Sequence, residues 1–136
     1  MPKTPMTHGY SKKTLAQKMG LKPGYRCLTM GAPNHYASLV GDAEDVAFGT
    51  RFRTADVVHW FCRRRADLDR DVERALQKVG ESGMLWISWP KKSSEQFIDL
   101  VEDDLRTVLL PRGWVDVKVC AVDADWSGLK FMRRRS

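Results

Sequence analysis

The sequence contains few cysteines and no long apolar run. Its three cysteines, Cys27, Cys62 and Cys120, lie far apart and form no C-x-x-C pair. Each lies in or at the end of a strand-like apolar stretch, which favours free buried thiols over disulfides or a zinc site. No apolar stretch could span a bilayer, and residues 1–10 lack the apolar segment of a secretory signal. We therefore expect a cytoplasmic protein with no membrane partner.

Motifs of common enzyme chemistries are also missing. The sequence has no G-x-x-x-x-G-K-S/T phosphate loop, no G-x-S-x-G nucleophile motif and no H-E-x-x-H metal motif. His8, His35 and His59 share no metal-ligand spacing, and His59 lies inside an apolar run, which is typical of a core histidine. The sequence predicts no catalytic residue and no metal site, and it leaves open whether the protein is an enzyme.

Acidic residues are absent from residues 1–41, which contain six lysines and arginines. All 17 acidic residues lie between Asp42 and Asp125, and the C-terminus adds Lys130 and the arginines of residues 133–135. Basic ends of this kind are typical either of contact with nucleic acid or an acidic protein, or of a solvated surface that serves solubility. Both interpretations stay open at this point.

What the chain does contain is the composition of a globular protein. Of its 136 residues, 43% are hydrophobic and 29% are charged, which is typical of one domain with a substantial core. We expect residues 1–11 to form a loosely ordered basic arm and residues 12–136 to form a single α/β domain.

Strand-like and helix-like stretches alternate along this domain. Strands are expected at residues 25–30, 46–52, 55–61, 84–89, 115–122 and 129–134, and helices at 13–19, 35–40, 64–79 and 97–109. Such alternation predicts a three-layer domain with a mainly parallel sheet. The short connection at residues 123–128 predicts an antiparallel C-terminal hairpin.

This order of elements resembles the Rossmann-like methyltransferase fold. The resemblance implies a glycine-rich loop after the first strand and an acidic residue at the end of the second strand, which hold S-adenosylmethionine. Here the loop at residues 30–34 contains only Gly31, and residues 46–54 contain Arg51 and Arg53 but no acid. The cofactor is therefore unknown. S-adenosylmethionine stays an alternative although its usual motif is absent.

Several longer segments match one bacterial family. They are residues 9–11, 15–16, 20–24, 55–58, 85–92, 115–123 and 126–131. Across nearly the whole chain, these segments resemble an uncharacterised bacterial family, domain of unknown function 3052. The resemblance implies a single compact domain of bacterial origin. Because no activity is assigned to that family, the resemblance implies no catalytic residue.

The segment LWISWPKKSS, residues 85–94, runs from an apolar strand directly into two lysines and an expected helix start. Strand ends and helix amides at the carboxyl edge of a parallel sheet form sites for anions. Lys91 and Lys92 would face the positive end of the helix dipole. Either a bound anion or a nearby acid, Glu95 or Asp99, would relieve that repulsion.

Two further residues near this edge have alternative roles. Ser93 and Gln96 match a capping box, which gives the Ser93 hydroxyl a structural role at the helix start. Trp126 lies in the predicted hairpin connection, and its ring is either a stacking platform for a ligand or a cover over the edge of the core.

We therefore predict a non-catalytic domain that binds an anionic small molecule at the carboxyl edge of its sheet. The predicted ligand-binding residues are Asn34, Tyr36, Trp89, Lys91, Lys92, Ser94, Asp123, Trp126, Ser127 and Gly128. One alternative is a divergent S-adenosylmethionine-dependent methyltransferase. The other is an interaction protein whose basic ends contact nucleic acid or an acidic protein. The sequence predicts no oligomeric state.

Overall fold

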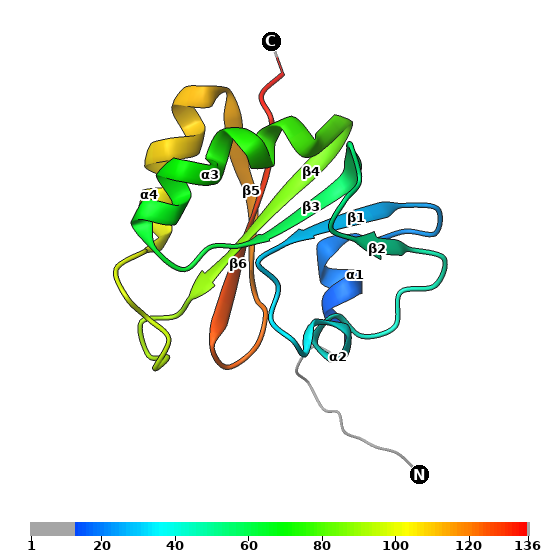
Figure 1. Ribbon diagram of the computed structural model, residues 1–136, viewed down its shortest axis with the longest axis horizontal. Helices are drawn as coiled ribbons and strands as arrows, with labels where there is room; N and C mark the ends of the chain where they lie inside the picture. Colours follow the sequence, from blue (N-terminus) through cyan, green and yellow to red (C-terminus); the bar gives the residue numbers. More distant parts are fainter. Residues whose placement is uncertain (1–12, 136) are drawn as a thin grey trace.

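Strands from the whole length of the chain pair into one sheet in a computed structural model that describes residues 13–135 (Figure 1). The strands are β1 (Arg26–Met30), β2 (Ala47–Gly49), β3 (Ala55–Phe61), β4 (Val79–Pro90), β5 (Trp114–Ala121) and β6 (Trp126–Arg133). Their order is β2-β1-β3-β4-β6-β5, with β6 antiparallel to both of its neighbours and the other pairs parallel. The expected α/β fold and its antiparallel C-terminal hairpin are confirmed. The predicted arm at residues 1–11 lies outside the described residues.

Helices cover both faces of this sheet (Figure 1). The helices are α1 (Leu15–Met19), α2 (Tyr36–Val40), α3 (Arg65–Lys78) and α4 (Glu102–Leu109), and a 3-10 turn follows at Leu110–Arg112. One face packs against α3 and α4, and the other packs against α1 and α2. The short helix α1 is fixed by its ends, because the Thr14 hydroxyl accepts the N–H of Gln17 and Gly20 ends the helix with a φ of 79°.

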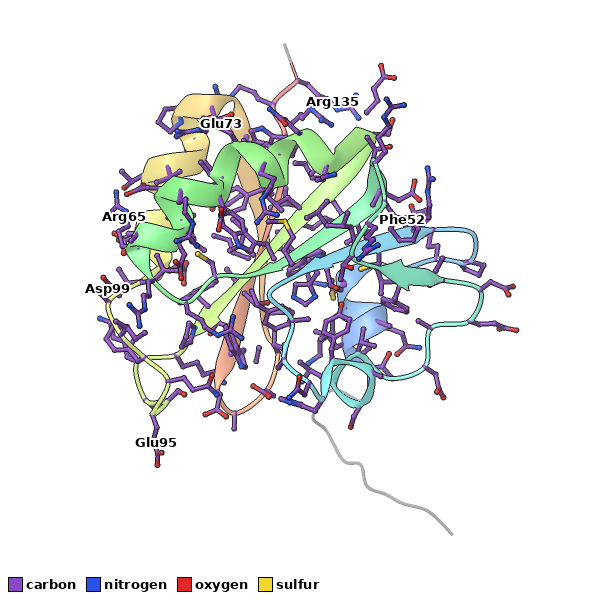
Figure 2. All side chains as sticks on the ribbon, in the orientation of Figure 1. Phe52, Arg65, Glu73, Glu95, Asp99 and Arg135 are labelled. Atoms are coloured by element: carbon purple, nitrogen blue, oxygen red, sulfur yellow. The ribbon has the colours of Figure 1, made fainter. Side chains whose placement is uncertain are left out.

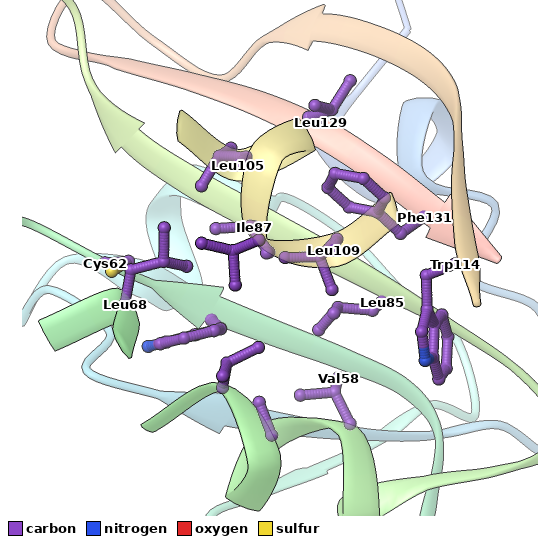
Figure 3. Close-up of a cluster of buried hydrophobic side chains, with 14 of the residues drawn as sticks. Val58, Cys62, Leu68, Leu85, Ile87, Leu105, Leu109, Trp114, Leu129 and Phe131 are labelled. Carbon is purple, nitrogen blue, oxygen red and sulfur yellow. The ribbon is translucent and has the colours of Figure 1, made fainter. Parts of the chain in front are cut away.

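Apolar residues are continuous in β3 because both faces of that strand are buried. Val57 packs in the cluster beneath α1 and α2, and Val58 packs in the cluster beneath α3 and α4; both side chains are fully buried. In Figure 3, Leu68 of α3 and Leu105 of α4 point into the second cluster, toward the sheet. The three cysteines are free thiols, and Cys27 and Cys62 are buried as the sequence predicts, whereas Cys120 is only partly buried.

The predicted start of α4 is wrong. The helix was expected from residue 97 with Ser93 as its cap, but it begins at Glu102. Its start is fixed instead by Asp104, whose carboxylate accepts the N–H of Val101 at 2.9 Å. Residues 91–101 contain turns and irregular backbone but no helix, so Ser93 caps no helix. Lys91 and Lys92 therefore do not lie at the first turn of α4, where they were expected to face the helix dipole.

The predicted start of β6 is also wrong. Trp126, Ser127 and Gly128 were expected in the hairpin connection but are the first residues of β6, paired with the end of β4. Asp123 makes the turn tight, because its carboxylate accepts the N–H groups of Asp125 and Trp126 at 2.8 and 2.9 Å. The strand therefore begins three residues earlier than its apolar pattern indicates.

Candidate functional site

A cavity of about 480 Å³ lies at the carboxyl end of β4, beside the start of α4. Its lining residues are Trp89, Lys91, Lys92, Val101, Glu102, Asp103 and Ser127. Four of the ten predicted site residues are therefore brought together. The three residues from the start of α4 were not predicted, because that helix was expected to begin at residue 97.

Among the described residues, the two lysines at this cavity lie without a direct acidic partner. Within residues 13–135, neither Lys91 nor Lys92 forms an ion pair. Glu95 points away from the molecule at the tip of the loop (Figure 2). The Asp99 carboxylate accepts the N–H of Arg65 at 2.9 Å. Neither of these two acids therefore forms an ion pair with Lys91 or Lys92.

The acids in the cavity wall are already paired. Arg106 contacts Glu102 at 2.5 Å and Asp103 at 3.1 Å. Arg106 also contacts Asp116 of β5 at 3.0 Å, and its hydrogen bond lowers the pKa of that carboxyl. Arg106 is thus the direct partner of all three acids, whereas neither cavity lysine has a direct acidic partner within residues 13–135.

Ser94 was predicted to bind the ligand, but it ties the loop to the hairpin instead. Its hydroxyl donates to the Asp125 carboxylate at 2.9 Å and accepts the N–H of Gln96 at 3.0 Å. The N–H of Lys91 donates to the Asp125 carbonyl at 2.8 Å. These bonds hold the loop in place beside the cavity, and Ser94 is not among its lining residues.

Trp126 and Gly128 were predicted to contact the ligand, and the structure contradicts both. Trp126 is only 1% exposed, and its ring packs edge-on against Phe61 at 5.1 Å. The guanidinium of Arg63 lies 5.0 Å above the ring. Trp126 is therefore a cover over the core rather than a stacking platform. Gly128 is buried, and a side chain there would meet Val122.

Tyr36 is also a packing residue, although it was predicted at the site. Its hydroxyl lies 2.9 Å from Nδ1 of His59, whose Nε2 lies 2.8 Å from the Ser88 hydroxyl. The Tyr36 ring packs edge-on against Phe61 at 5.7 Å. Burial lowers the pKa of His59 to about 3, so its ring is neutral at pH 7. His59 is the core histidine that the sequence predicts.

The carboxyl edge above β1 and β3 is closed. This is the point where the strand order reverses, and where ligands commonly bind in open α/β sheets. Arg63 donates to the carbonyl of Gly31 at 3.1 Å, across the ends of the two strands. Nε2 of His35 lies 3.7 Å from a carboxylate oxygen of Asp123, which joins the loop after β1 to the hairpin. Asn34 is exposed in that loop, away from the cavity residues.

No family model matches the chain, and no curated protein matches its sequence. Solved structures match its fold. The tRNA methyltransferase TrmK from B. subtilis has a TM-score of 0.58 and 10% identity, with 93% of this chain and 67% of TrmK covered. The DhpI–SAH complex has a TM-score of 0.58 and 10% identity, with 90% and 84% covered. Magnesium protoporphyrin IX methyltransferase from Synechocystis PCC 6803, with bound SAM, has a TM-score of 0.56 and 12% identity, with 88% and 74% covered.

These structural matches show the fold of the chain. The chain has a Rossmann-like methyltransferase fold, as the order of its elements predicts. The resemblance to domain of unknown function 3052 stays a prediction.

The residues at the reversal point do not fit S-adenosylmethionine in the way that the methyltransferase resemblance implies. Gly31 has a φ of +67°, but a side chain there would lie 2.8 Å from the carbonyl oxygen of Phe61. The absence of a side chain at Gly31 therefore lets the backbone of Phe61 pack close to it, which leaves no evidence of a role in cofactor binding. β2 has only three residues and is followed by Thr50 and Arg51, with no acid. No methyl-transfer step follows from these residues.

Among residues 13–135, no three His, Cys, Asp or Glu side chains lie close enough together to hold a metal ion. The same residues include no helix that is long and apolar enough to cross a membrane.

Proposed function

We propose that this chain is a divergent relative of the S-adenosylmethionine-dependent methyltransferases that binds its ligand at the carboxyl edge of the sheet. The supporting observation is the match of 88–93% of the chain to solved structures of this fold. Two of those structures hold SAM or SAH. The adenosyl group is therefore the first ligand to test, although the usual motif is absent.

An adenosyl ligand at the carboxyl ends of β1 and β3, where the strand order reverses, requires the Arg63 side chain to move. That movement breaks its hydrogen bond to Gly31 and its contact with Trp126. The bond from Arg63 to Gly31 lies at the surface, and the contact with Trp126 is a single cation–π interaction. Breaking two contacts of this kind costs about 1–2 kcal/mol in total. A cost of that size lowers the apparent affinity about 5- to 30-fold, because only the open state binds.

This proposal is tested by calorimetric titration of the full chain with SAM and SAH. Arg63→Ala is expected to bind about 5- to 30-fold more tightly than the unaltered chain, because opening no longer costs free energy. Arg64→Ala is the matched control, since the Arg64 side chain is exposed and adjacent, and its affinity should not change. Absence of binding by both the unaltered chain and Arg63→Ala at millimolar ligand would reject an adenosyl cofactor.

A second candidate is a non-catalytic anion site at the cavity beside α4. The observation that favours it is the pair of lysines without acidic partners in the described part of the chain, in a cavity whose acids are held by Arg106. An anion between Lys91 and Lys92 would give both ammonium groups a direct partner. Inorganic phosphate and ADP are suitable probes because both fit a cavity of about 480 Å³.

The anion site is tested by the thermal stability of the full chain with each probe. Ligand binding raises the unfolding temperature by mass action. The shift should be lost in the double variant Lys91→Ala, Lys92→Ala. It should persist in Arg134→Ala, Arg135→Ala, which removes two charges at the opposite end of the sheet. An equal loss in both double variants would mean that net charge, and not this cavity, attracts the anion.

A further inference from the structure

Four lysines from distant parts of the sequence lie near one another on the face of the sheet that carries α1. Lys118 of β5 and Lys130 of β6 are directly opposite partners in the antiparallel pairing. Lys130 is also the partner of Trp86, which packs in the cluster beneath α1. Side chains of directly opposed residues point to the same face of a sheet. Lys118 and Lys130 therefore point toward the side of α1.

Lys18 and Lys22 come from α1 and the loop after it. The Lys118 ammonium donates to the carbonyl of Lys18 at 3.4 Å. Burial, followed by the charges of Lys118 and Lys22, lowers the pKa of Lys130. We call Lys18, Lys22, Lys118 and Lys130 the lysine cluster.

The cluster is unfavourable for the isolated protein. Like charges directly opposite each other in a sheet are destabilising. Among the described residues, none of the four lysines forms an ion pair. Acidic side chains that do pair are gathered elsewhere, chiefly on α3 and α4, which cover the other face. The ion pairs of α3 and α4 therefore lie on the face opposite the lysine cluster.

We propose that the lysine cluster binds the phosphate backbone of a nucleic acid. Four ammonium groups on a rigid strand pair and helix offer point charges that suit phosphate oxygens. Protein interfaces are instead enriched in aromatic residues and arginine and depleted of lysine, and the cluster contains only lysine. Because the cluster has no group that would read base edges, it binds without regard to sequence.

The cluster differs from the basic ends that the sequence indicated. Three of its lysines, Lys18, Lys22 and Lys130, do come from those basic ends, but Lys118 lies within the acid-rich middle. Pairing of β5 with β6 brings it to the others. The binding surface therefore depends on the folded sheet and does not depend on the proposed ligand site at the carboxyl edge.

The test uses the full chain and a fluorescein-labelled DNA duplex of 20 base pairs, with affinity measured by anisotropy at several salt concentrations. Each phosphate contact adds about −0.9 to the slope of log affinity against log salt. Lys118→Gln, Lys130→Gln should bind at least tenfold more weakly at low salt and reduce the slope by about 2. A second duplex of different sequence should bind equally well.

The matched control is Arg134→Gln, Arg135→Gln, which removes the same charge from two exposed residues that belong to no proposed binding site. It should leave the slope unchanged, and an equal loss in both variants would overturn the proposal, because net charge alone would explain it. Tighter binding of polyglutamate than of the duplex would also overturn it, in favour of an acidic protein partner. Thermal unfolding of each variant checks the fold. Lys118→Gln, Lys130→Gln should be at least as stable as the unaltered chain, because it removes a like-charge pair.

Discussion

At the scale of single residues, His59 is a buried polar group with a partner at each ring nitrogen. Both of its ring nitrogens are within hydrogen-bond distance of a hydroxyl, one from Tyr36 of α2 and one from Ser88 of β4. His59 is 1% exposed, so its two bonds satisfy polar groups that water does not reach. The arrangement is structural, because neither His59 nor Ser88 is accessible to a substrate.

The neutral His59 makes stability depend on pH. Burial lowers its folded pKa to about 3, whereas an unfolded histidine titrates near 6.5. Between these values the unfolded chain binds a proton that the folded chain does not, so the free energy of unfolding falls as pH falls below about 6.5. The contribution has a limiting slope of about 1.4 kcal/mol per pH unit.

Urea denaturation at several pH values from 7.5 to 4.5 measures this dependence. His59→Gln keeps hydrogen-bonding capacity but does not titrate, so its curve should be flatter than that of the unaltered chain over this range. Parallel curves for the two proteins would show that other groups cause the acid sensitivity.

At the scale of secondary-structure elements, strands are predicted better than helix starts. The strand at residues 55–61 is predicted with the bounds that the structure has, because its continuous apolar run fits only a strand buried on both faces. The start of α4 is missed because Phe97 and Ile98 fit helical spacing. In the structure Ile98 is 49% exposed, so that spacing did not reflect burial.

Serines near a helix also allow two interpretations. Ser93 matches a helix cap, but short hydroxyl side chains such as those of Ser93 and Ser94 equally stabilise turns. Ser94 stabilises a turn because its hydroxyl donates a hydrogen bond to the carboxylate of Asp125, which is 31 residues away in sequence. A contact between residues so far apart in sequence cannot be predicted from the local sequence pattern around Ser94.

The corrected start of α4 predicts a contrast between two substitutions. Asp104→Ala removes the carboxylate that accepts the N–H of Val101 and a bond from Arg65, so it should lower the free energy of unfolding by about 1–2 kcal/mol. Ser93→Ala should change it by less than about 0.5 kcal/mol, because Ser93 is exposed and caps no helix. Urea denaturation of both variants checks this. A larger loss for Ser93→Ala would restore the earlier helix start.

At the scale of the whole molecule, the sequence predicts the fold more fully than the site. Alternating strands and helices are enough to predict the sheet and its hairpin. The cavity gathers Trp89, Lys91, Lys92 and Ser127, which are adjacent in sequence or directly paired across β4 and β6. Tyr36 and Trp126 instead turn into the core, where tertiary packing decided their orientation.

The two faces of the sheet should unfold together. Consecutive residues of β3, Val57 and Val58, belong to the two different core clusters, so loss of either cluster exposes the same strand. The helix α1 has only five residues and is too short to be stable away from the sheet. We therefore expect neither core cluster to stay folded once the other has unfolded.

Substitutions on opposite faces test this coupling. Leu105→Ala beneath α4 should lower the free energy of unfolding by about 2–5 kcal/mol, because Leu105 is fully buried. Leu15→Ala in α1 should cost less, since Leu15 is 6% exposed at the edge of its smaller cluster. In both variants, far-ultraviolet circular dichroism and tryptophan fluorescence should report one coincident transition. Separate transitions in Leu15→Ala would mean that the α1 face melts first, and that the shared strand does not join the clusters into one cooperative unit.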